Sequence, residues 1–181
     1  MRELSLHILD IVQNSIVAEA KNIYIEIYED LHLNIFRITI SDDGKGMDEE
    51  TLNNVNDSFV SSRTTRKVGM GIAIFRAAAE ISGGSLIVTS SLGKGTNITA
   101  TFEHDNIDRM PLGDIAETII VLLMRAKDIE YTYHHIYNDK DFIFSTNDIK
   151  EIIEDLPIDN YEILQYIKNY INDNLQELGV I

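Results

Sequence analysis

The chain has 181 residues, of which 44% are hydrophobic and 25% charged, values typical of a globular protein with its own core. It contains no cysteine, which excludes disulfides, zinc fingers, iron–sulfur clusters and thiol catalysis. No apolar run approaches the roughly 18 residues of a membrane span, and the N-terminus lacks the apolar core of a signal peptide, so we expect a cytoplasmic protein away from the membrane.

The charge is strongly negative and unevenly distributed. Fifteen basic and 30 acidic residues give a net charge of −15. Residues 1–103 account for −5 of this, and residues 104–181, with 6 basic and 16 acidic residues, for −10. An acidic chain repels nucleic acid, so we expect no nucleic-acid partner. The asymmetry predicts two parts, a domain over 1–103 and an acidic extension over 104–181.

Hydrophobic periodicity predicts an alternation of helices and strands. In the first part we expect helices over 4–20, 48–57 and 72–82, and strands over 23–28, 33–40, 85–90 and 96–103. The second part starts again with a helix over 111–126, followed by strands over 129–137 and 141–145 and helices over 148–155 and 160–178. The second part carries no catalytic signature, and its role is left open.

The first chemically informative pattern is an aspartate with two alternate glycines, Asp42-x-Gly44-x-Gly46, directly after a predicted strand. A carboxylate there can accept a hydrogen bond from an exocyclic amine. The two glycines let the backbone approach a flat ring closely, because no side chain intervenes. The same pattern is also typical of a tight acidic turn, so alone it leaves both interpretations open.

The second pattern is Gly69-x-Gly71 at the start of a predicted helix. A helix N-terminus offers free N–H groups and a partial positive charge, which attract phosphate. The stretch before it contains a cluster of cationic side chains, Arg63, Arg66 and Lys67. They could offset phosphate charge, or they could belong to a solvated loop.

The third pattern is Asp10 with Asn14 one turn later on the first predicted helix. Side chains four residues apart share a helix face. A carboxamide and a carboxylate on one face suit Mg²⁺, which prefers oxygen ligands and usually binds substrate phosphates as well. The alternative is a polar helix edge that faces solvent.

The order of these patterns over about residues 5–103 resembles the GHKL superfamily. This group includes gyrase B-type topoisomerases, the large heat-shock chaperones, histidine kinases, anti-sigma serine kinases and mismatch-repair MutL. The resemblance implies that ATP and Mg²⁺ are the ligands of this chain.

The resemblance also assigns roles to individual residues. In the N-box, Asn14 would hold Mg²⁺ and Asp10 would stand in the position of the general base. Asp42 would bind the adenine amine. The other nucleotide contacts that it implies are Gly44, Gly46 and Met47 of the first glycine box, the lid residues Phe59, Arg63, Arg66 and Lys67, the second glycine box Gly69, Met70 and Gly71, and the closing Thr96.

The sequence departs from the family pattern at two of these positions. Lys67 replaces the first glycine of the second box, where it could contact phosphate or restrict the lid. Asp10 is one methylene shorter than the glutamate base of gyrase-like and anti-sigma members, which weakens the case for ATP hydrolysis.

The fold that the resemblance implies is a two-layer α/β sandwich of the Bergerat type, with helices on one face of a mixed sheet, plus a small C-terminal α+β extension. ATP would lie between the helices over 4–20 and 72–82, under a lid formed by residues 58–71.

The function that it implies is that of a stand-alone regulatory protein kinase, serine-kinase-like or histidine-kinase-like, which transfers phosphate from Mg·ATP to a partner protein. The alternative is a nucleotide-gated interaction module or an ATPase switch without phosphotransfer. Neither His7, inside the N-box helix, nor the pair His134-His135, in a predicted strand, is a good phosphoacceptor candidate. The acceptor and the oligomeric state, a homodimer included, are left open.

Overall fold

The computed structural model describes residues 3–56 and 70–181. Along the chain the elements are α1 (Leu4–Val17), β1 (Asn22–Asp30), β2 (Ile35–Asp42), α2 (Glu49–Asn56), α3 (Met70–Ile81), β3 (Ser85–Ser91), β4 (Gly95–Glu103), α4 (Ile115–Arg125), β5 (Glu130–Tyr137), β6 (Lys140–Ser145), α5 (Thr146–Ile153) and α6 (Tyr161–Leu178). Each of the predicted helices and strands is present, with ends shifted by a few residues.

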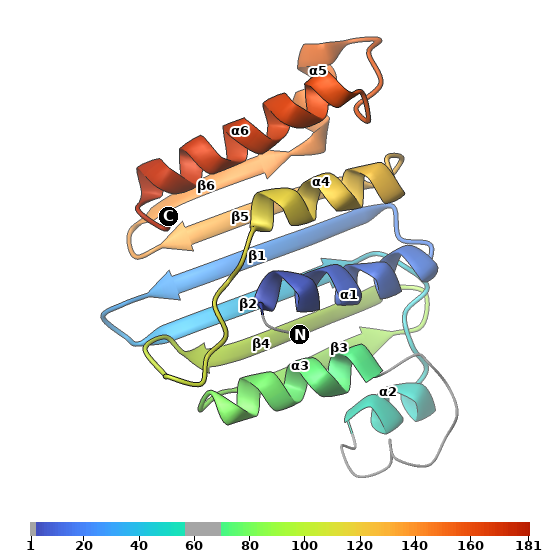
Figure 1. Ribbon diagram of the computed structural model, residues 1–181. Helices are drawn as coiled ribbons and strands as arrows, with labels where there is room; N and C mark the ends of the chain where they lie inside the picture. The colour runs from blue at the N-terminus through green and yellow to red at the C-terminus, as the bar shows by residue number, and fades with distance from the viewer. Residues whose placement is uncertain (1–2, 57–69) are drawn as a thin grey trace.

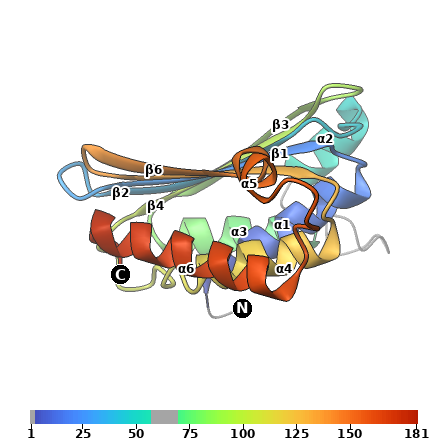
Figure 2. The ribbon, with the colours of Figure 1, turned by 90° about the horizontal axis from the view of Figure 1, so that it is seen from above.

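One mixed sheet organises the molecule. Its strand order is β3-β4-β2-β1-β5-β6, and every pairing is antiparallel except the parallel pairing of β1 with β5. Helices α1, α3, α4 and α6 lie on one face of this sheet (Figures 1 and 2). The predicted two-layer α/β architecture, with helices on one face of a mixed sheet, is therefore confirmed.

Alternation along the central strands explains this one-sided arrangement. Ile23, Ile25 and Ile27 of β1 are all buried, while the residues between them are half-buried on the other face. Strand β2 repeats the pattern. An apolar face with a polar face behind it needs only one helical layer, because the second face can meet water.

The helix predicted over 111–126 begins four residues later than expected, at Ile115. Gly113 has a φ of +82°, which does not fit a helix, and the Asp114 side chain accepts a hydrogen bond from the Glu117 N–H at 2.7 Å. Asp114 is thus the N-cap that sets the start of α4.

Residues 104–181 continue the sheet of the first part. Strand β5 pairs with β1 over eight positions, from Asn22 opposite Glu130 to Glu29 opposite Tyr137. Helix α4 packs against both α1 and α6. A domain boundary near residue 104 stays a prediction, and in the structure this point is a connection within one continuous sheet. Among the described residues, no helix is both long and apolar enough to cross a bilayer.

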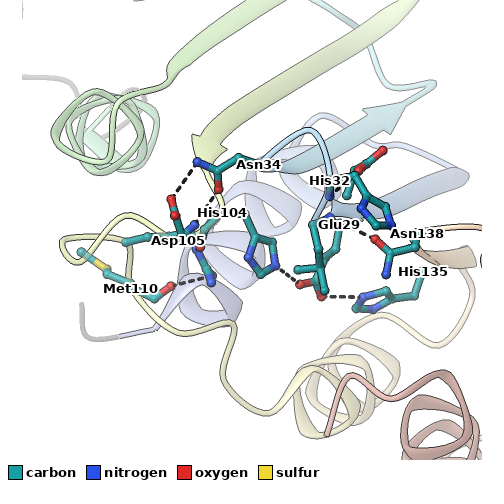
Figure 3. Close-up of polar contacts among 11 residues, drawn as sticks. Glu29, His32, Asn34, His104, Asp105, Met110, His135 and Asn138 are labelled. Atoms are coloured by element: carbon teal, nitrogen blue, oxygen red, sulfur yellow. Dashed lines mark hydrogen bonds and ion pairs between the residues drawn. The ribbon is translucent and has the colours of Figure 1, made fainter.

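A buried polar cluster ties the two parts together at the end of β1 (Figure 3). The Glu29 carboxylate accepts hydrogen bonds from Nε2 of His104 at 2.7 Å and from Nε2 of His135 at 2.9 Å. The Tyr133 hydroxyl lies 2.6 Å from Nδ1 of His135. Burial raises the pKa of Glu29, but the hydrogen bonds from His135 and His104 outweigh it and hold the pKa below its ordinary value. Strand β1, the segment after β4 and strand β5 therefore meet around the ionised carboxylate of Glu29.

This cluster predicts a pH-dependent contribution to stability. Because the folded-state pKa of Glu29 lies below its unfolded value, the carboxylate contributes stability above the unfolded pKa, and that contribution is lost as the pH falls through the folded one. Glu29→Gln should lower the free energy of unfolding near neutral pH by about 2 kcal/mol, since an amide cannot accept from both imidazoles. The deficit should shrink in acid, as measured by urea unfolding across pH.

The matched control is Glu80→Gln on the exposed side of α3, which should change little at any pH. A deficit in Glu29→Gln that is the same at acidic and neutral pH would contradict the ionised state assigned to this carboxyl.

Candidate functional site

The site is centred on the Asp42 carboxylate at the end of β2. The Ser15 hydroxyl on α1 donates to its Oδ2 at 2.6 Å, and the Gly44 N–H donates to its Oδ1 at 2.9 Å. The Thr96 N–H, opposite Asp42 on β4, donates to Oδ1 at 3.3 Å. A carboxylate has about four acceptor positions, so these three donors fix its orientation and leave one position for a ligand.

A shallow pocket of about 370 Å³ opens beside this carboxylate. It is lined by the end of β2 and the β3–β4 hairpin, namely Ser41, Asp42, Thr89, Ser90, Ser91, Lys94, Gly95, Thr96 and Asn97. The Ser90 hydroxyl accepts from the Met47 N–H at 2.9 Å, donates to the Gly95 carbonyl at 2.8 Å and lies 3.0 Å from the Thr96 hydroxyl. Hydroxyl groups, one carboxylate, one amide and one ammonium group thus line the pocket, a set of donors and acceptors that suits a polar ligand.

The glycines of the first box fit against neighbouring backbone. A Cβ on Gly46, whose φ is +65°, would lie 2.0 Å from the Ser91 carbonyl oxygen, and a Cβ on Gly44 would lie 2.8 Å from the Ala18 carbonyl oxygen. Gly95, with a φ of +90°, would place a Cβ 1.8 Å from the Asp42 carbonyl oxygen. These positions admit no side chain, so the loop packs directly onto the hairpin.

Asp10 and Asn14 lie on α1, on the side that approaches α3. Asp10 is exposed and Asn14 half-buried. A Cβ on Gly71, in the first turn of α3, would lie 2.0 Å from Oδ2 of Asp10. The N-box helix and the described part of the second glycine box therefore meet at Gly71, beside Met70, which is exposed.

His7 is buried one turn before Asp10. It is 1% exposed, stacks on Phe75 with ring centroids 5.1 Å apart, and finds no hydrogen-bond partner for either ring nitrogen among the described residues. Burial lowers its pKa, the N-terminal charge lowers it further, and Asp10 acts weakly in the opposite direction. A neutral, enclosed imidazole fits the expectation that His7 is not a phosphoacceptor.

The structure thus brings together Asp42, Thr96 and the first glycine box at one point, and Asp10 with Gly71 at another, joined by α1. The other predicted contacts, Phe59, Arg63, Arg66, Lys67 and Gly69, lie outside the described residues.

Two hydroxyls in the site were missed by the sequence analysis, Ser15 and Ser90. Ser15 had a detectable signal, because it interrupts the apolar stripe formed by Ile8, Ile11 and Val12 on the buried face of α1. Ser90 had none, since serine is common in hairpins.

Comparison with known proteins identifies the family. Residues 2–106, more than half of the chain, match the model of the histidine kinase-, DNA gyrase B- and HSP90-like ATPases. The chain belongs to this family. The resemblance to the GHKL superfamily is therefore confirmed, and the matched residues include α1, the Asp42 loop and the β3–β4 hairpin.

Curated relatives are similar to about half of the chain. The heme sensor protein HssS of Staphylococcus saprophyticus is 30% identical over 95 residues, which are 52% of this chain and 21% of HssS. The sensor histidine kinase YvrG of Bacillus subtilis is 26% identical over 98 residues, 52% of this chain and 17% of YvrG. The chain thus matches about a fifth of the length of these relatives.

A solved structure supports the fold. The crystal structure of the N-terminal domain of a DNA repair protein superposes with a TM-score of 0.52 at 19% identity, and covers 79% of this chain and 52% of that one. Its coverage extends beyond the residues matched by the family model. At this identity the likeness concerns architecture alone.

The packing of the hairpin predicts a contrast between two glycines that both have positive φ. Gly95→Ala should lower the free energy of unfolding by about 3 kcal/mol, because the methyl group adds a clash with the Asp42 carbonyl to the strain of the left-handed backbone. Gly93→Ala, at a φ of +75° with nothing within 4 Å, should cost only the strain, about 1 kcal/mol. Urea unfolding measures both, and equal losses would contradict the close approach of Gly95 to Asp42.

Proposed function

We propose that this chain binds Mg·ATP and transfers phosphate to a partner protein as a regulatory protein kinase. The observation that carries the proposal is the Asp42 carboxylate, which three protein donors orient while one acceptor position stays open beside a polar pocket. An exocyclic amine of adenine is a donor that fits this position. Membership of the ATPase family and the similarity to a sensor histidine kinase support the same ligand and the same chemistry.

The triphosphate would run from this pocket along α1 toward the start of α3. A helix N-terminus there would suit phosphate oxygens. The half-buried carboxamide of Asn14 is the protein oxygen that would hold Mg²⁺. The ion would supply neutralisation of the phosphoryl charge, and the protein residues would bind and orient the nucleotide.

Asp10 is the candidate general base. Asp10 is exposed and its carboxylate lies against Gly71, on the side of α1 that would face the nucleotide, so an incoming hydroxyl could reach it. A carboxylate at this place can orient a nucleophile and accept its proton. The aspartate side chain is one methylene shorter than glutamate, so its carboxylate lies further from the nucleophile. A hydroxyl on a docked partner protein can be held closer to Asp10, which favours it as the nucleophile over a free water.

The second candidate function is a nucleotide-gated interaction module. Helix α1, which carries Asp10 and Asn14, also contacts α4 of the extension, and Arg125 Nη1 donates to Gln13 Oε1 at 3.2 Å. A shift of α1 on nucleotide binding would therefore reach residues 104–181 without any phosphotransfer.

The nucleotide pocket is tested with two neighbouring carboxylates. Asp42→Asn should abolish binding of Mg·ATP in calorimetry, because the amide loses the acceptor that the amine needs, and the far-UV circular dichroism should stay unchanged. Asp43→Asn is the matched control: Asp43 accepts from the Lys21 and Asn22 N–H groups and holds the start of β1, so its loss should affect stability and spare binding. Equal affinity of wild type and Asp42→Asn would rule out this pocket.

The catalytic role is tested by separating binding from transfer. Asp10→Asn should bind Mg·ATP within about threefold of wild type and lose about 100-fold or more in phosphotransfer, since a general base contributes roughly that much. The measurement is transfer of radiolabel from ATP to proteins of a cell extract. Wild type that binds ATP but labels no protein and releases no phosphate would favour the gated module.

A further inference from the structure

We propose that edge strand β6 and helix α6 form a docking groove for an extended segment of a partner protein that carries basic side chains. The groove lies in residues 104–181, at the opposite edge of the sheet from the β3–β4 hairpin, and the proposal does not depend on nucleotide binding.

The strand at this edge is available for pairing. Strand β6 is the last in the sheet and pairs only with β5 among the described strands. The other edge strand, β3, is packed against by α2, which lies beside it in Figure 1. The outward N–H and C=O groups of β6 are thus a template on which an extended peptide can add a strand.

Helix α6 provides the second wall. It packs along β6 (Figure 1), and together they enclose a hollow of about 380 Å³ lined by Lys140, Asp141, Phe142, Asn174, Glu177 and Leu178. The Phe142 ring meets Tyr170 edge to face with centroids 5.6 Å apart, and Tyr170 stacks on Tyr166 at 6.2 Å. Tyr166 is 52% exposed and Tyr170 37% exposed, so an aromatic surface continues from the hollow along the edge.

The negative charge around the hollow favours a basic peptide as its ligand. Glu177 and Lys140 line the hollow, and the Asp141 carboxylate at the same edge pairs with Nε2 of His134 at 2.9 Å, on the face of β6 opposite the buried Phe142 and Phe144. The wider acidic excess is that of residues 104–181, which carry a net charge of −10. Exposed tyrosine faces also attract ammonium and guanidinium groups. A basic peptide therefore complements both features, whereas a second copy of this chain would bring the same acidic residues and a net charge of −15.

The probe is a fluorescein-labelled eight-residue peptide of alternating valine and arginine, which favours an extended conformation, and the control is alternating valine and glutamate. We expect the basic peptide to raise the fluorescence anisotropy in a saturable way and the acidic peptide to leave it unchanged. Hydrogen exchange of the amides over 140–145 should slow in the complex, because strand addition pairs the outward groups of β6.

Glu177→Lys tests the location. It should weaken binding of the basic peptide about tenfold, since it replaces an attractive charge in the hollow by a repulsive one. Glu50→Lys on α2 is the matched control, because it changes the net charge equally at the other edge of the sheet, and it should bind as wild type does.

The proposal is overturned by any of three results. The first is no anisotropy change at roughly 1 mM of protein, the weakest range in which such docking is meaningful. The second is a result that indicates attraction to the acidic surface in general. This would be either an equal loss of peptide affinity in Glu177→Lys and Glu50→Lys, or peptide binding without slower hydrogen exchange over residues 140–145. The third is concentration-dependent self-association that protects β6 without peptide, which would assign the groove to a second copy.

Discussion

The hydrogen bond from the Ser15 hydroxyl to Asp42 fixes the relation between helix and sheet on which the whole site depends. Ser15 is buried, and the 2.6 Å contact ties α1 to the end of β2. Because α1 is held there, Asn14 and Asp10 point along its neighbouring face toward the start of α3. The same bond orients the carboxylate, so one interaction sets both the direction of the Asp42 side chain and the position of the polar residues of α1 relative to it. A helix shifted by one residue would lose the bond and turn its polar edge away.

Local pattern was enough to predict the elements, because alternation in the strands and the apolar stripe of α1 depend only on neighbouring residues. Local pattern could not predict the pairing of β1 with β5. Ile23, Ile25 and Ile27 alternate in the same way whether β1 lies at an edge or in the centre, and about 100 residues separate the two strands. The Glu29 cluster was hidden for the same reason, since His104 and His135 come from segments with no common spacing. In the site, Asp42 and the glycines form a recognisable sequence motif. The role of Ser90 could not be predicted in this way, because it depends on a hydrogen bond from the Met47 N–H, 43 residues away.

The two polar centres at the ends of the sheet differ in what they leave unsatisfied. Glu29 is buried, and each of its oxygens accepts from an imidazole, so its remaining acceptor positions are closed to a ligand and it acts as a structural tie between the two parts of the chain. Asp42 is held by three donors at the rim of a pocket and keeps one acceptor position. A hydrogen-bonded carboxylate is therefore buried as a structural tie in one place and lies at the rim of a pocket in the other.

The acidic composition is compatible with an anionic ligand because most of the net negative charge belongs to the second part of the chain. Residues 104–181 carry −10 of the −15, and their two strands, β5 and β6, lie beyond β1 on the side away from β2, β4 and β3. Five strand spacings separate β3 from β6, or about 24 Å, which is more than twice the screening length of about 8 Å at physiological salt. Lys94 lines the pocket, so the local field there can differ from the average field of the chain. The same separation means that the acidic edge can attract basic segments without competing with a nucleotide.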